Sequence, residues 1–417
     1  MRIHRGWIIA AVTFFTLIAA AAFRSTTSPL MIPLETEFDW SRSLTSTALS
    51  INLLFYGLTA PFSATMMNRF GVRRVVVFAL VLVAAGSGMT VWMTEIWQLY
   101  LYWGAFVGFG TGCLALVFAS MVANRWFHKH RSLVTGIFSA AYATGQLVFL
   151  PLITGIAENS GWRYGALVVS AFALLIVPLF WFTYRESPTE LGTFPVGASE
   201  QIAEDSKPAI SVRENIKVLF EAAKRLQFWV LAGTFFVCGW TTNGLIGAHF
   251  IPAAHDHGMA STMAAGLLAV VGIFDFVGTI ASGWLTDRVN PIFLLAIYYG
   301  FRGVALFTVP FVLGPTVEPP LLFFVVFYGL DWIATVPPTV ELCRRYFGLT
   351  NSPVIYGWVF ASHMVGASIA AGFAGLIRDT QGDYYIAWIT AAVLCIVAAV
   401  AVFALKPIPK SSQQATV

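Results

Sequence analysis

The sequence predicts an all-α membrane protein of about twelve transmembrane helices in two six-helix repeats. Of the 417 residues, 58% are hydrophobic and only 11% are charged, whereas an ordinary soluble domain has roughly 25% charged residues. Apolar runs of about 20 residues, long enough to cross a bilayer, recur along nearly the whole chain. The net charge of +4 requires no nucleic-acid partner, because the excess of Lys and Arg lies in short loops between these runs.

The first six spans are expected in the N-terminal part of the chain. The N-terminal segment has the basic start of a signal peptide, but its apolar stretch continues to about Pro33. That is too long for a cleaved signal, so we expect it to be the first span. The expected spans of this half cover residues 7–33, 44–67, 75–95, 98–123, 132–155 and 164–184.

A long polar stretch over residues 185–226 separates this half, residues 1–184, from a second half over residues 227–417. We expect the stretch to be a cytoplasmic linker, and its segment ISVRENIKVLFEAAKRLQ to form an amphipathic helix on that face of the membrane. The expected spans of the second half cover residues 227–252, 260–285, 291–313, 320–342, 353–377 and 384–405.

The distribution of basic residues predicts the orientation of these spans. With both termini cytoplasmic, 19 of the 24 Lys and Arg residues lie inside and three outside, namely Arg42, Arg163 and Arg378. The remaining two, Arg24 and Arg302, fall within spans. The positive-inside rule therefore favours cytoplasmic termini, and we expect a multi-pass protein of a bacterial-type inner (plasma) membrane.

An internal repeat supports the division into halves. A shift of 219 residues aligns Ala64–Arg69 with Gly283–Arg288 and Arg125 with Arg344. A shift of 221 residues aligns glycines of the fifth span with glycines of the eleventh. A parallel repeat of six helices is a known plan of transport proteins.

The loop after the second span carries a motif. It reads Ala64-Thr-Met-Met-Asn68-Arg69-Phe-Gly71-Val-Arg73-Arg74, and its repeat copy reads Gly283-Trp-Leu-Thr-Asp287-Arg288. This resembles the G-x-x-x-D-R-x-G-x-R-R loop of the major facilitator superfamily, although the first copy lacks the first Gly and the Asp. The resemblance implies that this loop and its repeat copy act as gates of the transport path, because their charges can pair and cap helix ends in one conformation only. The candidate gating residues are Asn68, Arg69, Gly71, Arg73, Arg74, Gly283, Asp287 and Arg288.

A second motif is narrower. The stretch from Trp126 to Gly145, WFHKHRSLVTGIFSAAYATG, is similar to the helix 4–5 signature of monocarboxylate porters, in the branch that includes oxalate–formate antiporters. It departs from that signature at Val134 and Ala141. Resemblance to the superfamily covers essentially the whole chain, whereas this motif covers about 20 residues.

Together the resemblances imply a secondary active transporter that moves a small organic anion, a proton-coupled monocarboxylate, by alternating access. Its expected partners are therefore the anion, a proton and the lipid bilayer. An exporter of a larger amphipathic or drug-like compound is the alternative, since 36 Phe and 14 Trp could line an apolar cavity. An anion exchanger is another.

Arg24 lies 17 residues into the first span, about 26 Å along a helix axis. A charge deep in a bilayer costs about 2.5–3.5 kcal/mol on insertion scales, so such residues usually face a cavity or a partner. The guanidinium of Arg24 could bind a carboxylate through two parallel hydrogen bonds. Alternatively, it could extend to the outer headgroups.

Two acidic residues also lie deep in spans. Asp275 shares one helix face with Thr279, at the position where the resembling porters have an Arg, so Arg302 is the candidate counter-ion. Asp331 precedes a Pro337-Pro338 kink that makes its helix a candidate moving part. Either carboxylate could carry the coupling proton as access alternates, or could stay ionised in a pair with Arg302.

Repeat symmetry adds candidates for binding the substrate. Asn243 corresponds to Arg24 and Tyr56 to Asp275 under the 219-residue shift. His363 could titrate near neutral pH or bond to a backbone carbonyl. The shift of 221 residues pairs Tyr142 with His363, and Gln146 lies one turn after Tyr142.

Other reactive residue types receive no role. His249 and the run His255-Asp256-His257 are expected as surface polar residues at the outer end of the seventh span, with a metal site as the alternative. No nucleophile motif, H-E-x-x-H motif or P-loop is present, so we expect no enzyme, cofactor or metal. The apolar surroundings of the cysteines favour packing roles; they are Cys113, Cys238, Cys343 and Cys395.

Overall fold

The computed structural model describes residues 4–24, 26–198 and 211–405. Within these ranges the side chains of residues 116–117, 131–132, 139–140, 142–144, 146 and 349–350 are not described. Apart from one bridge between Phe127 and Val196, all regular structure in the described part of the chain is helical. The predicted all-α class is therefore confirmed.

The N-terminal half contains the first nine α-helices. They are α1 (Arg5–Arg24), α2 (Thr27–Phe38), α3 (Arg42–Phe70), α4 (Val72–Met89), α5 (Ile96–Leu99), α6 (Gly108–Cys113), α7 (Leu116–Trp126), α8 (Arg131–Ser160) and α9 (Trp162–Thr183). Between them lie η1 (Thr90–Trp92) and a π-helical segment, η2 (Tyr100–Val107), and η3 (Pro188–Leu191) follows α9.

The remaining helices begin with α10, which lies within the expected linker, and continue through the C-terminal half. They are α10 (Val212–Ala223), α11 (Leu226–Gly239), the π-helical η4 (Trp240–Ile246), α12 (Gly247–Asp256), α13 (Ser261–Thr286), α14 (Pro291–Val312), α15 (Pro319–Asp331), α16 (Val336–Gln381), α17 (Tyr385–Ala401) and η5 (Val402–Ala404). α16 contains two helices that meet at Gly348, whose φ of 78° is left-handed and costs glycine nothing.

Ten segments of the described chain are long and apolar enough to cross a membrane. α3 and α8, of 29 and 30 residues, complete the bundle. Two spans end clearly later than expected: α2 ends at Phe38 rather than near Pro33, and the tenth span ends at Gly348 rather than at residue 342. Prolines are tolerated inside membrane helices, because hydroxyl groups and neighbouring helices bond to the carbonyls that a proline leaves without a backbone donor. Near the junction of α1 and α2, Thr26 and Thr27 donate to the carbonyls of Phe23 and Arg24.

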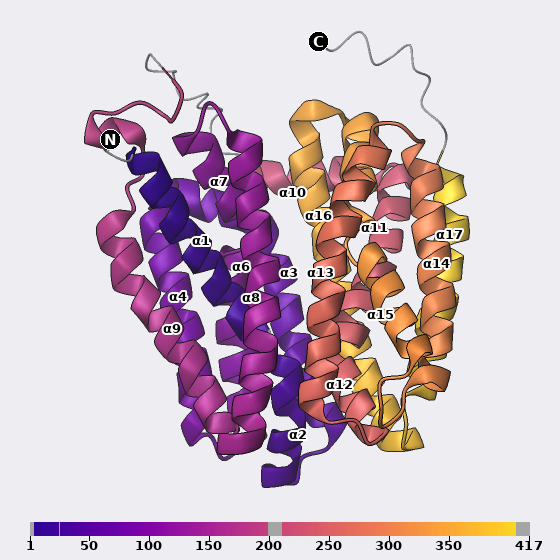
Figure 1. The fold of residues 1–417 in the computed structure, drawn as a ribbon. Helices are drawn as coiled ribbons and strands as arrows, with labels where there is room; N and C mark the ends of the chain where they lie inside the picture. The colour runs from indigo at the N-terminus through magenta and orange to yellow at the C-terminus, as the bar shows by residue number, and fades with distance from the viewer. Residues whose placement is uncertain (1–3, 25, 199–210, 406–417) are drawn as a thin grey trace.

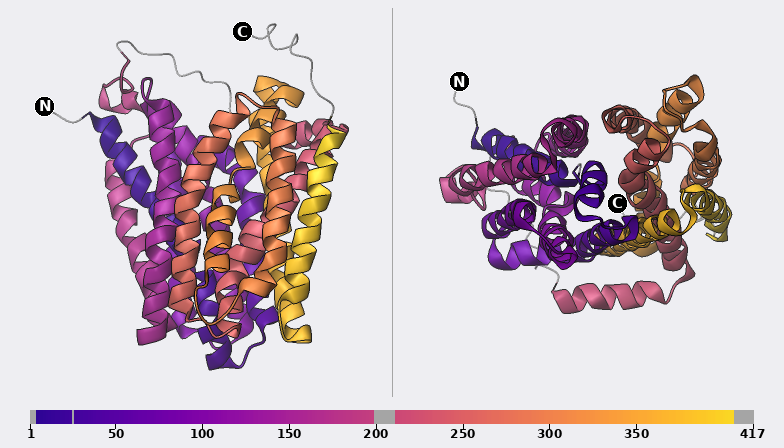
Figure 2. Two further views of the ribbon diagram at one scale, coloured as in Figure 1. Left: turned by 45° about the vertical axis from the view of Figure 1, so that its right-hand side comes forward. Right: turned by 90° about the horizontal axis from the view of Figure 1, so that it is seen from below.

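The two halves stand side by side, with α1–α9 on one side of the bundle and α11–α17 on the other (Figure 1). The start of α1 and the end of α17 lie at the same end of the bundle, here called the termini end, and the opposite end is called the far end. α10 lies across the direction of the long helices, near the termini end (Figure 2).

The halves meet most extensively where α3 packs against α16. A Cβ atom at Gly57 of α3 would overlap the side chain of Met364, and one at Gly375 of α16 would contact Ser46 at 2.5 Å. Ser50 and Ser368 exchange hydrogen bonds with each other's carbonyls at 2.7 and 2.8 Å. Small residues thus let two backbones approach closely, as is common between membrane helices.

Candidate functional site

A cavity of about 330 Å³ lies between the two halves. Most of its wall is apolar, with aromatic side chains such as Phe138, Trp332 and Phe360. Its polar lining is contributed by both halves: Arg24, Ser28, Tyr56, Thr111, Thr242, Asn243, Asp275, Thr279 and His363. A mainly apolar pocket with a few convergent polar groups is the usual form of a small-molecule site.

Three polar side chains form a chain that joins the halves across this cavity. Arg24 of α1 donates from Nη2 to Asn243 Oδ1 of η4 at 2.8 Å. The amide Nδ2 of Asn243 lies 3.0 Å from His363 Nε2 of α16. Because the Asn243 oxygen accepts from Arg24, its nitrogen must donate to His363, which therefore accepts at Nε2 as a neutral imidazole. The Arg24 guanidinium also lies over the Tyr56 ring, 4.6 Å from its centroid.

Glycines place η4 and α11 against α16. A Cβ atom at Gly239 would overlap the backbone of His363, and one at Gly244 would contact the carbonyl of Ala367 at 2.5 Å. η4 is π-helical, a conformation frequent at functional sites because it widens the helix locally. The backbone at these positions therefore brings Asn243 within hydrogen-bonding distance of His363.

Asp275 of α13 lies in the wall of the same cavity, with 9% of its surface exposed. Its Oδ1 accepts from Thr279 Oγ1 at 3.1 Å and from the backbone N–H of Ile333 at 3.0 Å. Ile333 lies between the end of α15 and the start of α16, where helical bonding is interrupted. The carboxylate thus connects α13 to a break in the neighbouring helix.

The buried ion pair of the C-terminal half is behind this wall. Arg302 Nε lies 2.6 Å from Asp331 Oδ2, and its Nη2 donates to the carbonyls of Asp331 and Trp332 at 2.6 and 3.1 Å. Its Nη1 contacts Cys238 Sγ, which does line the cavity, at 3.0 Å. The counter-ion of Arg302 is therefore Asp331 and not Asp275. The interrupted helix offers the guanidinium backbone carbonyls as well as this carboxylate.

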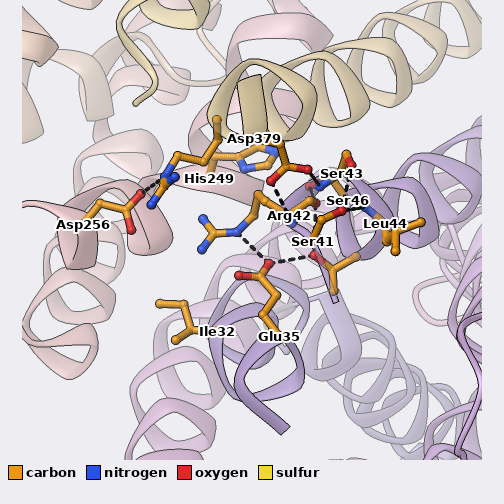
Figure 3. A network of polar contacts seen from close by, with 12 residues as sticks. Ile32, Glu35, Ser41, Arg42, Ser43, Leu44, Ser46, His249, Asp256 and Asp379 are labelled. Atoms are coloured by element: carbon orange, nitrogen blue, oxygen red, sulfur yellow. Dashed lines mark hydrogen bonds and ion pairs between the residues drawn. The ribbon is translucent and has the colours of Figure 1, made fainter. Parts of the chain in front are cut away.

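Polar contacts also join the halves at the far end (Figure 3). Asp379, at the end of α16, accepts from the backbone N–H groups of Arg42 and Ser43 at 3.0 and 2.8 Å. A carboxylate there stabilises the N-terminus of α3. The Arg42 side chain pairs with Glu35 at 2.6 Å and donates to the Tyr384 hydroxyl of the other half. We call Glu35, Arg42, Asp379 and Tyr384 the far-end lock.

His249 is not a surface residue, contrary to the expectation from sequence. It is fully buried, with Nδ1 3.2 Å from the Tyr384 hydroxyl and Nε2 2.9 Å from the Ala371 carbonyl. Asp256 pairs with Arg378 at 2.6 Å. In the described ranges, no three His, Cys, Asp or Glu side chains are grouped as metal ligands.

The first copy of the candidate gating motif lies at the end of α3 and the start of α4, which topology places at the termini end. The second copy, with Gly283, Asp287 and Arg288, lies at the end of α13. Arg125 donates to Asn68 at 2.9 Å and lies 3.4 Å from Glu186, which in turn accepts from the N–H groups of Val72 and Arg73. A carboxylate therefore caps α4 although the motif's own Asp is absent.

The other gating residues make fewer contacts. Arg73 lies over the Trp181 ring at 4.7 Å, Arg69 over Phe70 at 5.3 Å, and Arg288 over Trp284 at 4.2 Å. Arg74 and Asp287 are exposed, and a Cβ atom at Gly283 would meet nothing within 4 Å in the described structure. Gly71 has a φ of 87°, which explains a glycine between α3 and α4.

Four of the six expected binding residues, Arg24, Tyr56, Asn243 and His363, are brought together in the cavity. The side chains of the other two, Tyr142 and Gln146, lie outside the described residues. Sequence reasoning missed Glu186, Asp379 and Tyr384. The available signal for the two acids was a carboxylate beside an arginine at the end of an apolar span, in Arg185-Glu186 and Arg378-Asp379.

Comparisons with known proteins agree with this architecture. The family model described as Major Facilitator Superfamily matches residues 13–350. The chain is 24% identical over 407 residues to the "Uncharacterized MFS-type transporter YcxA" of Bacillus subtilis (strain 168), covering 96% of this chain and 95% of that protein. It is 23% identical over 405 residues to "Monocarboxylate transporter 12" of Xenopus laevis, covering 92% and 85%.

Among solved structures, the inward open conformation of the xylose transporter XylE from E. coli superposes with a TM-score of 0.73 at 15% sequence identity. The match covers 97% of each chain. At that identity the likeness establishes the fold.

Proposed function

Since this chain belongs to the Major Facilitator Superfamily, we propose that it is a secondary active transporter that carries a small organic anion, a monocarboxylate, together with a proton. The two halves alternate access to the cavity between them. Relatives named as monocarboxylate transporters support this class of substrate. The fold and the superfamily support the transporter itself.

The observation that carries the substrate proposal is the contact between Arg24 and Asn243. A guanidinium in the cavity wall donates at 2.8 Å to a neutral amide oxygen of the opposite half. A substrate carboxylate is a stronger acceptor for the guanidinium than an amide oxygen, because it carries a full negative charge and can accept two parallel hydrogen bonds. The carboxylate would replace Asn243 Oδ1 at Arg24, while the apolar wall contacts the carbon skeleton.

Asp275 is the proposed site of proton coupling. It lines the cavity and accepts hydrogen bonds from a hydroxyl and a backbone N–H group. Such a carboxyl group can be protonated without breaking an ion pair. Asp331, in contrast, is bonded to the buried Arg302 at 2.6 Å, and protonating it would leave a buried arginine without compensation. We therefore assign a structural role, and no role in proton coupling, to the pair formed by Arg302 and Asp331.

In this proposal the termini end faces the cytoplasm, because 19 of 24 Lys and Arg residues fall on that side of the expected spans. The far-end lock then closes the outer side of the cavity. Opening that side requires Asp379 to leave the N-terminus of α3 and Tyr384 to leave Arg42. The loops with Asn68 and Asp287 would form their second set of contacts in the outward-facing state.

The test is uptake into liposomes that contain the purified protein. Labelled lactate, pyruvate, formate or oxalate is supplied with and without an inward proton gradient. Gradient-driven accumulation of a monocarboxylate is the expected result. Uptake that requires a counter-anion but no gradient would indicate an exchanger, and no uptake of any of the four would refute the choice of substrate class.

A variant series then tests the role of Arg24. Hydrogen bonds to charged groups contribute about 1.5–3 kcal/mol, so Arg24→Gln should lower uptake at low substrate concentration by roughly 10- to 100-fold. Arg5→Gln, an exposed arginine at the termini end, is the matched control and should leave uptake unchanged. If Arg24→Gln transports the anion normally, the guanidinium does not bind it.

The mainly apolar wall of the cavity favours a second candidate, export of a larger amphipathic compound. The two candidates differ in their dependence on Arg24. An exporter of this kind should still move bulky apolar dyes after Arg24→Gln, whereas an anion transporter should not move such dyes at all.

A further inference from the structure

α10 is held to the bundle by one face only. Asn215 donates from Nδ2 to the carbonyl of Pro61 in α3 at 3.0 Å and accepts from Trp358 Nε1 in α16 at 2.7 Å. Asn215 and Ala222 are buried on this inner face. The single helix thus contacts an element from each half while its outer face remains exposed.

The outer face of α10 is apolar. Val212, Ile216 and Phe220 recur every four residues and are 48%, 37% and 66% exposed. At about 100° per residue they form one stripe beside the buried face. Two further exposed side chains, Leu226 and Trp229, continue the apolar surface onto the start of α11.

Charged residues follow this stripe in a fixed order around the helix. Arg213, Lys217 and Lys224 are exposed and lie directly beside the apolar stripe, and Glu214 and Glu221 lie beyond them. Hydrogen bonds from the backbone N–H and the hydroxyl of Ser211 hold the pKa of the Glu214 carboxyl below its usual range at the N-terminus of α10. The Lys224–Glu221 pair, at 3.0 Å, is fully at the surface and so constrains Lys224 little.

The depth of α10 is set by the span that follows it. α10 ends at Ala223 and α11, a membrane-crossing segment, begins at Leu226. Trp229 Nε1 donates to the carbonyl of Ala223 at 2.8 Å, and tryptophan is enriched at the boundary between headgroups and acyl chains. α10 lies across the long helices (Figure 2), which is the orientation of a helix in the plane of a membrane surface.

We propose that α10 is a docking surface for anionic lipids, with acyl chains against Val212, Ile216 and Phe220 and with lipid phosphates at Arg213, Lys217 and Lys224. The order of inner face, apolar stripe, basic row and acidic row places each kind of side chain at the matching depth of a lipid monolayer. This inference depends on the membrane fold and not on the substrate.

The apolar contact is tested with Phe220→Cys carrying an environment-sensitive NBD label. The four native cysteines are buried, although Cys238 borders the cavity, so the unmodified protein treated with the same reagent gives the background to be subtracted. In phosphatidylcholine vesicles containing phosphatidylglycerol, the emission should shift to the blue and be quenched by lipids spin-labelled in the upper acyl chain. Emission as in water, without quenching, would overturn the docking of this face.

The preference for anionic lipid is tested by native mass spectrometry of the full chain with phosphatidylglycerol or phosphatidylcholine. The triple variant Arg213→Gln/Lys217→Gln/Lys224→Gln should lose affinity for phosphatidylglycerol on the order of 100-fold, at about 1 kcal/mol for each basic residue. Glu214→Gln/Glu221→Gln is the matched control on the same helix and should retain or strengthen binding.

A second control, Arg5→Gln/Lys129→Gln, removes exposed charge at the termini end away from α10 and should bind phosphatidylglycerol normally. Melting temperatures of all variants in detergent report whether they are folded. Equal retention of phosphatidylglycerol by the triple variant and the unmodified protein would refute the basic row as a headgroup site. Tighter binding of phosphatidylcholine than of phosphatidylglycerol by the unmodified protein would also refute it.

Discussion

At the scale of single residues, the charged side chains in the cavity wall differ from those behind it in the partners that they bind. Arg302 and Asp331 bind each other behind the wall, whereas Arg24 and Asp275 lie in the wall and bond there to Asn243, Thr279 and a backbone N–H group. In the proposal, Arg24 therefore exchanges a neutral partner for the ligand, and Asp275 takes up the proton. The pair formed by Arg302 and Asp331 stabilises the interruption between α15 and α16.

Asn243→Asp tests whether Arg24 receives a carboxylate. The new carboxylate would lie where the amide oxygen accepts at 2.8 Å, so it should pair with the guanidinium and compete with the substrate from within. Anion uptake should fall at least 10-fold. Asn243→Ala, which places no carboxylate beside Arg24, should retain more uptake; the reverse order would contradict the assignment.

Asp275→Asn separates transport from coupling. The amide keeps the size of the side chain and its acceptor oxygen for Ile333, but it cannot be protonated. The variant should still exchange labelled for unlabelled anion across the membrane while losing accumulation driven by a proton gradient. Exchange and accumulation assays on the same liposomes distinguish these, and gradient-driven accumulation by Asp275→Asn would exclude this residue as the proton site.

At the scale of elements, close helix contacts depend on particular glycines. Gly239 and Gly233 both lie in α11, but a Cβ atom at Gly239 would overlap the His363 backbone, whereas one at Gly233 meets nothing within 4 Å. Gly233→Ala should stabilise the helix slightly, by about 0.5–1 kcal/mol. Gly239→Ala should lower the melting temperature in detergent and reduce anion binding, and equal melting temperatures would contradict the packing described here.

The far-end lock is also an element-scale device, because Asp379 of α16 binds the first backbone N–H groups of α3. Asp379→Asn keeps one acceptor but loses the charge, so the locked state should be weakened by about 1–2 kcal/mol. A Ser28→Cys reporter in the cavity should then react roughly 10-fold faster with a membrane-impermeant maleimide added at the far end. Asp383→Asn, an exposed acid nearby, is the control and should leave the rate unchanged.

At the scale of the whole molecule, the sequence was sufficient for the helical membrane class and for much of the cavity. Hydropathy located the spans because about 20 apolar residues are required wherever a helix crosses a bilayer. Repeat symmetry pointed to Asn243 and Tyr56, since equivalent helices line the cavity from both sides. The intramembrane charge rule pointed to Arg24 and Asp275.

What escaped the sequence were contacts made between distant segments. Nothing in the spacing of residues indicates that Arg302 bonds the carbonyls of an interrupted helix, or that His249 is buried against Tyr384. Asp379 caps α3 across 336 residues of chain, and a helix-capping pattern is recognisable in sequence only when both partners are local. Such contacts depend on how the two halves meet.

The measurement that tests the central claim most directly is the internal pH of proteoliposomes when lactate or pyruvate is added outside, with protein-free liposomes as the baseline. Proton-coupled anion transport should acidify the lumen faster than in the baseline, and Arg24→Gln and Asp275→Asn should each return the rate to it. Anion uptake without any added acidification would contradict proton coupling, and acidification that persists in both variants would contradict the site.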